Sequence, residues 1–242
     1  MKKKLSIITI CFNSEDSIKR TIESVCNQKD KEVEYIVIDG KSTDSTLEII
    51  KNYQSLIDKI ISEKDEGIYD AYNKGIEHSS GEYIMFLNGG DFLTKNAITN
   101  IIKKIKNSEP KIFYSKVNIY DENLNLSYVK KGKKSFSPFW LMQPYSTPSL
   151  VINKNIFTKF GKFDLTLSTI ADYDFIIRLI KNNETFEEIN FITSNFVRGG
   201  VSDTKYDSDQ RLKMFKKNNL SYFSYFLNNL LHKFFKIKNR FK

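Results

Sequence analysis

The sequence predicts an α/β protein whose mostly parallel sheet is flanked by helices and followed by a basic amphipathic helical tail. Short β-branched runs alternate with stretches of helical periodicity through the first 110 residues, which is typical of βαβ units. These runs are continuously apolar rather than alternating, as in strands covered on both faces. Of the 242 residues, 40% are hydrophobic and 28% charged, so we expect one large domain with an appendage.

The first half divides into four strands separated by helices. Strands are predicted at 5–10, 33–39, 60–62 and 82–87. Apolar residues spaced three and four apart predict a helix in each interval and a further helix over 94–105. The connections between parallel strands should be right-handed crossovers.

The second half is predicted to extend the same sheet. Residues 111–120 and 126–129 are strand-like on either side of a turn, which indicates a hairpin. A strand is predicted at 149–152 and a helix over 172–181. No second apolar core is indicated, so residues 1–210 are expected to form one domain and residues 211–242 a helical tail.

The net charge of +9 lies in the tail. From Arg211 onward there are nine basic residues and no acidic ones, whereas residues 1–210 contain 29 of each kind. A nucleic-acid-binding protein would be basic over its body, so no nucleic acid partner is expected. The two cysteines form no disulfide framework and fit a cytoplasmic protein.

Neither a signal peptide nor a membrane span is expected. Residues 1–13 are expected to contain the first strand of the fold. No apolar run approaches the roughly 18–20 residues that a span requires.

Apolar residues in the tail recur at helical spacing, and two interpretations remain open. They are Leu220, Phe223, Phe226, Leu227, Leu230, Leu231, Phe234 and Phe235. The tail either packs on the body or lies as an interfacial helix on an anionic membrane, with its lysines attracted to the lipid. Calmodulin-like or RNA binding are further alternatives. An interfacial helix would place the protein on the inner face of the cytoplasmic membrane.

Several carboxylates occupy positions where an α/β sheet binds ligands. Asp39, Asp65 and Asp91 each follow a predicted strand, at the edge where the carboxyl ends of parallel strands meet. Asp172 and Asp174 begin a helix, where the dipole favours anions. Each has an alternative interpretation as a helix cap or a solvated turn. Since the sequence lacks a dinucleotide fingerprint and a Walker phosphate loop, the pattern predicts an anionic ligand with a divalent ion.

Five ordered motifs resemble the family 2 glycosyltransferases of the GT-A fold. They are residues 6–14 (SIITICFNS), 34–46 (EYIVIDGKSTDST), 65–75 (DEGIYDAYNKG), 81–91 (GEYIMFLNGGD) and 171–178 (ADYDFIIR). The resemblance covers about residues 4–200 and is closest to bacterial enzymes of capsule, exopolysaccharide and O-antigen synthesis. It implies a nucleotide-sugar donor, most often a UDP-sugar, inversion at the anomeric carbon, and Mn²⁺ or Mg²⁺. Residues 1–110 would bind the nucleotide-sugar, and residues 111–210 the acceptor.

The resemblance also assigns roles to individual residues of the sugar-donor site. Thr9, Cys11 and Asn13 would line the nucleotide pocket, and Asp39 would accept the uracil N3–H. Asp65, Tyr69 and Asn73 would form the wall beside the base or ribose. Asn88, Gly89, Gly90 and Asp91 take the place of the family's acidic metal motif, which leaves Asp91 as its one carboxylate. Arg198 would either reach the diphosphate or lie at the surface.

Asp172 matches the position of the base that deprotonates the acceptor hydroxyl in the family. Asp174 is the alternative base, and Arg178 would be a buried partner to one of the two. Ser146 or Thr147 stands where relatives often carry a histidine. The acceptor would be a glycan or a lipid-linked oligosaccharide. Two other readings stay open: a catalytically inactive nucleotide-sugar-binding homologue, and a nucleotidyltransferase on a similar scaffold.

Overall fold

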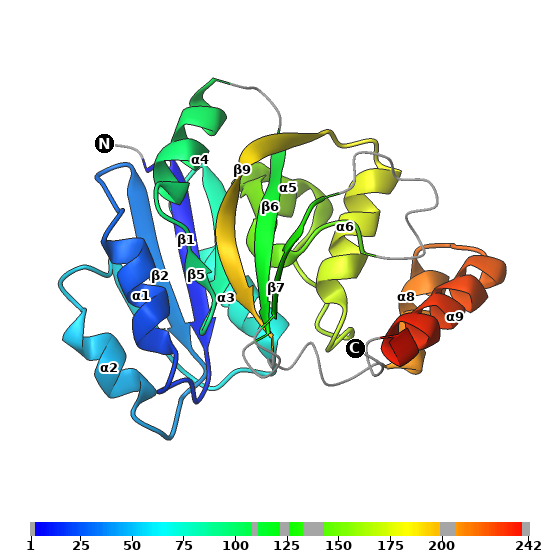
Figure 1. Ribbon diagram of the computed structural model, residues 1–242, viewed down its shortest axis with the longest axis horizontal. Helices are drawn as coiled ribbons and strands as arrows, with labels where there is room; N and C mark the ends of the chain where they lie inside the picture. Colours follow the sequence, from blue (N-terminus) through cyan, green and yellow to red (C-terminus); the bar gives the residue numbers. More distant parts are fainter. Residues whose placement is uncertain (1–2, 108–110, 122–125, 133–142, 199–206, 239–242) are drawn as a thin grey trace.

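One mixed sheet, with helices on both faces, organises the computed structural model (Figure 1). The structure describes residues 3–107, 111–121, 126–132, 143–198 and 207–238, with side chains as far as residue 231. Within these residues nine strands form a sheet of order β3-β2-β1-β4-β8-β6-β9-β5, with β7 paired to β6. The strands are β1 (Leu5–Cys11), β2 (Val33–Asp39), β3 (Lys59–Ser62), β4 (Tyr83–Asn88), β5 (Phe92–Leu93), β6 (Ile112–Asp121), β7 (Leu126–Lys130), β8 (Leu150–Asn153) and β9 (Phe186–Val197).

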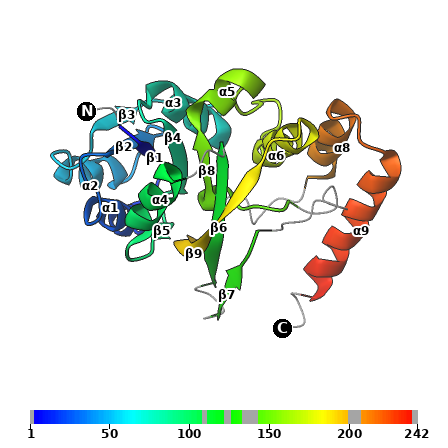
Figure 2. The ribbon, with the colours of Figure 1, turned by 90° about the horizontal axis from the view of Figure 1, so that it is seen from above.

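Helices cover the sheet as two layers (Figure 2). They are α1 (Ile18–Cys26), α2 (Thr46–Asn52), α3 (Ile68–His78), α4 (Ala97–Lys106), α5 (Lys154–Phe160), α6 (Ala171–Lys181), α8 (Ser208–Lys217) and α9 (Tyr222–Lys238), with a 3-10 turn η2 at Thr147–Ser149. Strand β1 is buried throughout and its side chains alternate between two cores. Ile8 and Ile10 face the core formed with α3, α5, α6 and α8. Leu5 and Ile7 face the core formed with α1, α2 and α4.

The first four predicted strands are confirmed as β1 to β4, and all three of their pairings are parallel. The second half is mixed, because β8 runs antiparallel to β4 and to β6 while β9 runs parallel to β6. The predicted hairpin is confirmed as β6 and β7. The sequence did not indicate β5 or β9. Strand β9 alternates poorly between buried and exposed positions, so it carries no clear strand pattern.

Helix α8 is fastened to the body and is not part of a separate tail. Met214 and Phe215 are buried in the core that contains α6. The buried carboxylate of Asp174 accepts hydrogen bonds from Asn218 Nδ2 at 2.7 Å and from Lys217 Nζ at 3.0 Å. The boundary predicted between residues 210 and 211 therefore falls inside this helix.

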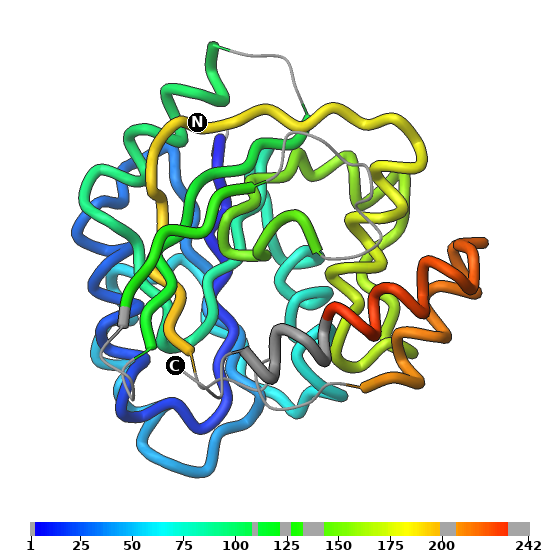
Figure 3. Tube along the Cα trace, turned by 45° about the vertical axis from the view of Figure 1, so that its right-hand side comes forward, coloured from blue at the N-terminus to red at the C-terminus, as the bar shows by residue number. Residues whose placement is uncertain are grey.

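Helix α9 lies against α8 on the outer side of the molecule (Figure 3). The Tyr225 ring packs edge-on against Phe215, and the buried side chain of Asn228 accepts a hydrogen bond from Arg211. Among the residues described, no helix is long and apolar enough to cross a membrane.

Candidate active site

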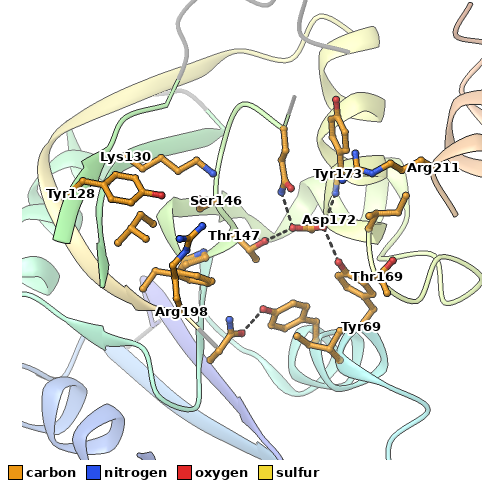
Figure 4. A pocket seen from close by; sticks show the side chains of 18 residues that line it. Tyr69, Tyr128, Lys130, Ser146, Thr147, Thr169, Asp172, Tyr173, Arg198 and Arg211 are labelled. Atoms are coloured by element: carbon orange, nitrogen blue, oxygen red, sulfur yellow. Dashed lines mark hydrogen bonds between the residues drawn. The ribbon is translucent and has the colours of Figure 1, made fainter. Parts of the chain in front are cut away.

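A cavity of about 330 Å³ opens beyond the carboxyl end of β4 (Figure 4). Its lining comes from α3, the β6–β7 hairpin, η2, the start of α6, the end of β9 and α8. Four residues selected from the sequence meet here: Tyr69, Asn88, Asp172 and Arg198. Thr147 and Ser146, the residues that the resemblance placed opposite a histidine, line it as well. The fold therefore brings the predicted base and part of the predicted metal motif to one cavity.

Asp172 is held by four hydrogen bonds that fix both carboxylate oxygens. Its Oδ1 accepts from the Tyr69 hydroxyl at 2.8 Å and from the Tyr173 backbone N–H at 2.9 Å. Its Oδ2 accepts from Gln143 Nε2 at 2.7 Å and from Thr147 Oγ1 at 2.9 Å. These donors come from α3, α6 and the segment that leads into β8, so three parts of the fold set the orientation of one carboxylate.

Helix α3 contacts both Asp172 and the predicted metal motif. Tyr69 donates to Asp172, and Tyr72, one turn later, donates to Asn88 Oδ1. Burial raises the pKa of both phenols well above the usual value, and the negative charge of Asp172 adds to that rise. Both hydroxyls therefore remain protonated at neutral pH and act as hydrogen-bond donors.

Asp91 is buried at the end of the glycine-containing motif. Gly90 adopts φ +107°, a backbone conformation that favours glycine, and its N–H donates to Thr21 Oγ1. Asp91 Oδ1 accepts from the Val197 backbone N–H at 3.0 Å. Its Oδ2 is buried and has no hydrogen-bond partner among the residues described. Burial raises the pKa of the Asp91 carboxyl to about 7, so its charged form is poorly stabilised by the protein alone.

The segment Asn88–Asp91 offers one oxygen, Asp91 Oδ2, that could bind a divalent ion. Within the described residues no three His, Cys, Asp or Glu side chains cluster as a metal site. A hard cation can nevertheless be held by one carboxylate when phosphate oxygens and water complete its shell. The residues therefore fit an ion that binds together with a diphosphate. Because Asp91 is only 3% exposed, this corner must open for the ion to reach it.

A second polar cluster lies at the carboxyl ends of β1 and β2. Asp39 accepts hydrogen bonds from the hydroxyls of Ser42 and Ser62 and from the Ser42 backbone N–H. Asn13 Oδ1 accepts from the Thr43 backbone N–H at 2.9 Å, which ties the ends of β1 and β2 together.

Asp65 borders this cluster. A Cβ built on Gly40 would lie 2.8 Å from Asp65 Oδ2, so a larger residue at this position would displace the Asp65 carboxylate. Burial raises the pKa of Asp65, an effect that its ion pair with Lys74 at 2.7 Å opposes. The predicted positions of Asn13, Asp39 and Asp65 at one sheet edge agree with the structure, although none of these three described residues lines the cavity.

Four residues that the sequence analysis named as candidate site residues are buried and form contacts within the fold. Thr9 is fully buried, with its hydroxyl 3.1 Å from that of Tyr35, and the Cys11 thiol is buried against the Ile38 carbonyl. Both side chains were predicted to line the nucleotide pocket; they are buried and do not line the cavity described above.

The other two, Asn73 and Asp174, also have their polar groups occupied by contacts within the fold. The Asn73 amide is occupied by the backbone N–H and C=O of Phe163, so it cannot form the predicted nucleotide wall. Asp174 is fully buried and paired with Arg178 at 3.0 Å, which argues against it as the alternative base. Arg178 is thus a partner of one of the two aspartates, as predicted, but its own side chain is 19% exposed and not buried.

The cavity also contains residues that the sequence did not single out as functional. They include Tyr128, Lys130, Gln143, Thr169, Tyr173 and Arg211. Lys130 belongs to a basic stretch visible in the sequence, which is the one signal that could have pointed to it. Gln143 and Arg211 reach the cavity only through tertiary structure.

The fold and cavity define an α/β protein with a cavity beyond the carboxyl end of the parallel strand β4, the edge at which such sheets bind ligands. Residues 6–175 match glycosyl transferase family 2, and the chain belongs to this family. It is 28% identical over 225 residues to the cholesterol galactosyltransferase of Borreliella burgdorferi, covering 87% of this chain and 61% of that protein. It is 31% identical over 199 residues to an uncharacterized glycosyltransferase of Methanocaldococcus jannaschii, covering 78% of this chain and 68% of that protein.

Solved structures show the same fold. S. aureus TarS residues 1–349 in complex with UDP-GlcNAc superpose with a TM-score of 0.74 at 17% identity. The match covers 89% of this chain and 65% of the TarS chain. The present chain thus spans less than two thirds of that chain and of the B. burgdorferi relative.

Proposed function

We propose that this protein transfers a sugar from a nucleotide-sugar, of the UDP class, to a hydroxyl group of a glycan or lipid-linked acceptor, with inversion at the anomeric carbon. The observation that carries the proposal is Asp172, a carboxylate fixed by four hydrogen bonds in a cavity at the carboxyl edge of the sheet. Membership of family 2 and the complex of TarS with UDP-GlcNAc support the choice of sugar donor. Synthesis of a cell-surface polysaccharide would use this chemistry.

In this mechanism Asp172 acts as the general base. The acceptor hydroxyl gives its proton to Asp172 as its oxygen attacks the anomeric carbon, and the bond from that carbon to the diphosphate breaks. Because each Asp172 oxygen already accepts two hydrogen bonds, the acceptor hydroxyl must replace one of them. All four donors line the cavity, but Tyr69, Thr147 and Tyr173 are buried whereas Gln143 is partly exposed, so the Gln143 bond to Oδ2 is the one to be exchanged.

The departing diphosphate would be stabilised at the Asn88–Asp91 corner. Asp91 would hold a Mn²⁺ or Mg²⁺ ion, which supplies Lewis-acid stabilisation of the leaving group. Arg198 lines the cavity and also contacts Asp121, 3.4 Å from its Nη1, so its guanidinium is oriented and would face the phosphates.

Calorimetry with UDP and UDP-GlcNAc, with and without Mn²⁺, tests the sugar-donor and metal assignments together. UDP should bind, and Mn²⁺ should tighten its binding. The Asp91→Asn variant should lose the metal-dependent part, on the order of tenfold in affinity, as expected when a metal site is disrupted. Asp16→Asn changes an exposed carboxylate and serves as the matched control.

Each outcome of that experiment decides one claim. Absence of UDP binding in all conditions would overturn the proposed function. Unchanged metal dependence in Asp91→Asn would remove Asp91 as the ligand. If UDP-sugars bind but a panel of them yields no product with lipid-linked acceptors, as followed by mass, the chain is an inactive binding homologue instead.

Helix α9 is proposed to lie on the anionic inner face of the cytoplasmic membrane. Tyr222, Phe223, Phe226 and Leu230 are 71%, 69%, 56% and 55% exposed. At 3.6 residues per turn they fall within about 100° of the helix surface, opposite the side that packs on α8. The nine basic and no acidic residues from Arg211 to Lys242 provide the complementary charge. An apolar helix face with adjacent lysines is the arrangement that binds lipid headgroups.

Substitution of this apolar face should release the full-length protein from anionic vesicles. We expect Phe226→Ser combined with Leu230→Ser to lower cosedimentation with phosphatidylglycerol-containing vesicles several-fold, since both side chains would lose apolar burial. Leu56→Ser removes a comparably exposed leucine, at 48%, on the body and should have no effect. Equal sedimentation of all variants would contradict membrane binding by α9.

A further inference from the structure

The side chains around Asp172 carry an excess of positive charge. Of the residues that line the cavity, three are cationic, namely Lys130, Arg198 and Arg211, and Asp172 is the one acidic residue among them. Lys130 ends β7, Arg198 follows β9, and Arg211 belongs to α8. Three separate parts of the fold therefore bring a positive charge to the same space.

The cations lie on both sides of Asp172. Figure 4 shows Lys130 and Arg198 together on one side and Arg211 on the other, beside Tyr173. Arg211 is oriented by its hydrogen bond to the buried Asn228, at 3.1 Å. The negative charge of Asp172 is already shared among four hydrogen-bond donors. A ligand that extends from the base toward either of these two sides thus meets a cation.

Cationic side chains collected in a partly enclosed space attract an anionic ligand. Guanidinium groups bind phosphate and carboxylate groups through paired hydrogen bonds, and an ammonium group binds them as a point charge. A neutral sugar would gain neither interaction. The cavity therefore favours a ligand with a phosphate or carboxylate group.

The sugar donor accounts for one of the three cations. Its diphosphate is assigned above to the Asn88–Asp91 corner with Arg198. Lys130 and Arg211 remain, on the hairpin and on α8, in the half of the chain that follows residue 110. Arg211 also connects the cavity to α9 through Asn228, so an acceptor bound beside it lies near the helix proposed to contact lipid.

We propose that the acceptor is itself anionic, and that Lys130 and Arg211 bind a phosphate or carboxylate group close to the hydroxyl that is glycosylated. This inference rests on the proposed function, because it takes Asp172 as the base. It adds the chemical class of the acceptor, which the family membership does not define.

Binding of small sugars to the UDP-saturated, full-length protein tests this assignment. Glucose 1-phosphate and glucuronate should bind when UDP already fills the sugar-donor site, and methyl glucoside should bind on the order of tenfold more weakly. Lys130→Gln and Arg211→Gln should each weaken binding of the anionic sugars by about tenfold and leave UDP binding unchanged. Lys131→Gln is the matched control, since it removes an exposed neighbouring charge. Lys130→Arg and Arg211→Lys should retain most of the binding.

Four results would overturn the proposal, and none of them bears on UDP binding by the unmodified protein. They are equal affinity for neutral and anionic sugars, no binding of either anionic sugar, displacement of the anionic sugars by UDP, and an equal loss of UDP affinity in Lys130→Gln and Arg211→Gln. The last two would assign these cations to the sugar donor's diphosphate. Thermal melting of each variant shows that a loss of binding is not a loss of folding.

Discussion

Replacement of Asp172 with Asn is expected to lower the rate of sugar transfer by about 10²–10⁴-fold, the range contributed by a positioned general base. The amide cannot take the proton of the acceptor hydroxyl. The substitution keeps the size of the side chain and one oxygen, so part of the contact network with Tyr69 and Thr147 can persist. The affinity for UDP should therefore remain within a few-fold of the unmodified protein. Single-turnover kinetics and calorimetry measure the two quantities separately.

Asp16→Asn, an exposed carboxylate substitution, is the control for the loss of one negative charge. Full transfer activity in Asp172→Asn would show that another group removes the proton. A parallel loss of UDP binding would show instead that Asp172 supports the structure of the sugar-donor site.

Asp174→Asn is expected to lower the free energy of unfolding by about 1.5–3 kcal/mol, because it weakens the charge-assisted hydrogen bonds that this buried carboxylate accepts from Arg178 and Lys217, which are both partly exposed. The Asp174 carboxylate is fully buried and contacts Arg178, Lys217 and Asn218. In a chain of this size the melting temperature should fall by about 5–10 °C. Urea denaturation followed by circular dichroism gives both the free energy and its midpoint.

Asp164→Asn provides a matched comparison, because Asp164 also pairs with Lys217, at 2.7 Å, but its side chain is 24% exposed. Partly exposed ion pairs contribute little, so the expected loss is about 1 kcal/mol or less. If both variants are equally stable, Asp174 does not fasten α8 to the body. Below its melting transition, Asp174→Asn should still transfer sugar, in contrast to Asp172→Asn.

The first half of the fold could be predicted because each short stretch of its sequence indicates its own secondary structure. Runs such as Leu5–Cys11 are apolar over their whole length, and only a strand covered on both faces buries every position of such a run. Strand β9 could not be predicted in the same way. Seven of its twelve positions are only partly buried, and its pairing with β6 shifts register near Lys116. Its place in the sheet is determined by contacts with a strand about 75 residues earlier in the chain.

In the candidate site, too, some residues could be interpreted from the sequence and others depend on tertiary contacts. Asp172, Asn88 and Arg198 line one cavity. The sequence pattern itself indicated Asp172, at the start of a helix, whereas Asn88 and Arg198 were indicated by the resemblance to the family. Asn73 and Asp174 could not be interpreted from the sequence, because their partners are Phe163 and Asn218, 90 and 44 residues away. Motif position alone therefore does not distinguish a polar residue that faces a ligand from one that secures the fold.

The two tyrosines of α3 restrict how this segment can change its length. Tyr69 binds Asp172 and Tyr72 binds Asn88, so one helical turn joins the second half of the chain to the end of β4. A single inserted residue between them would rotate one ring by about 100° relative to the other, and only one of the two bonds could be retained. In related sequences that preserve both bonds, insertions and deletions should therefore be absent from this turn, even where the surrounding loops vary freely in length.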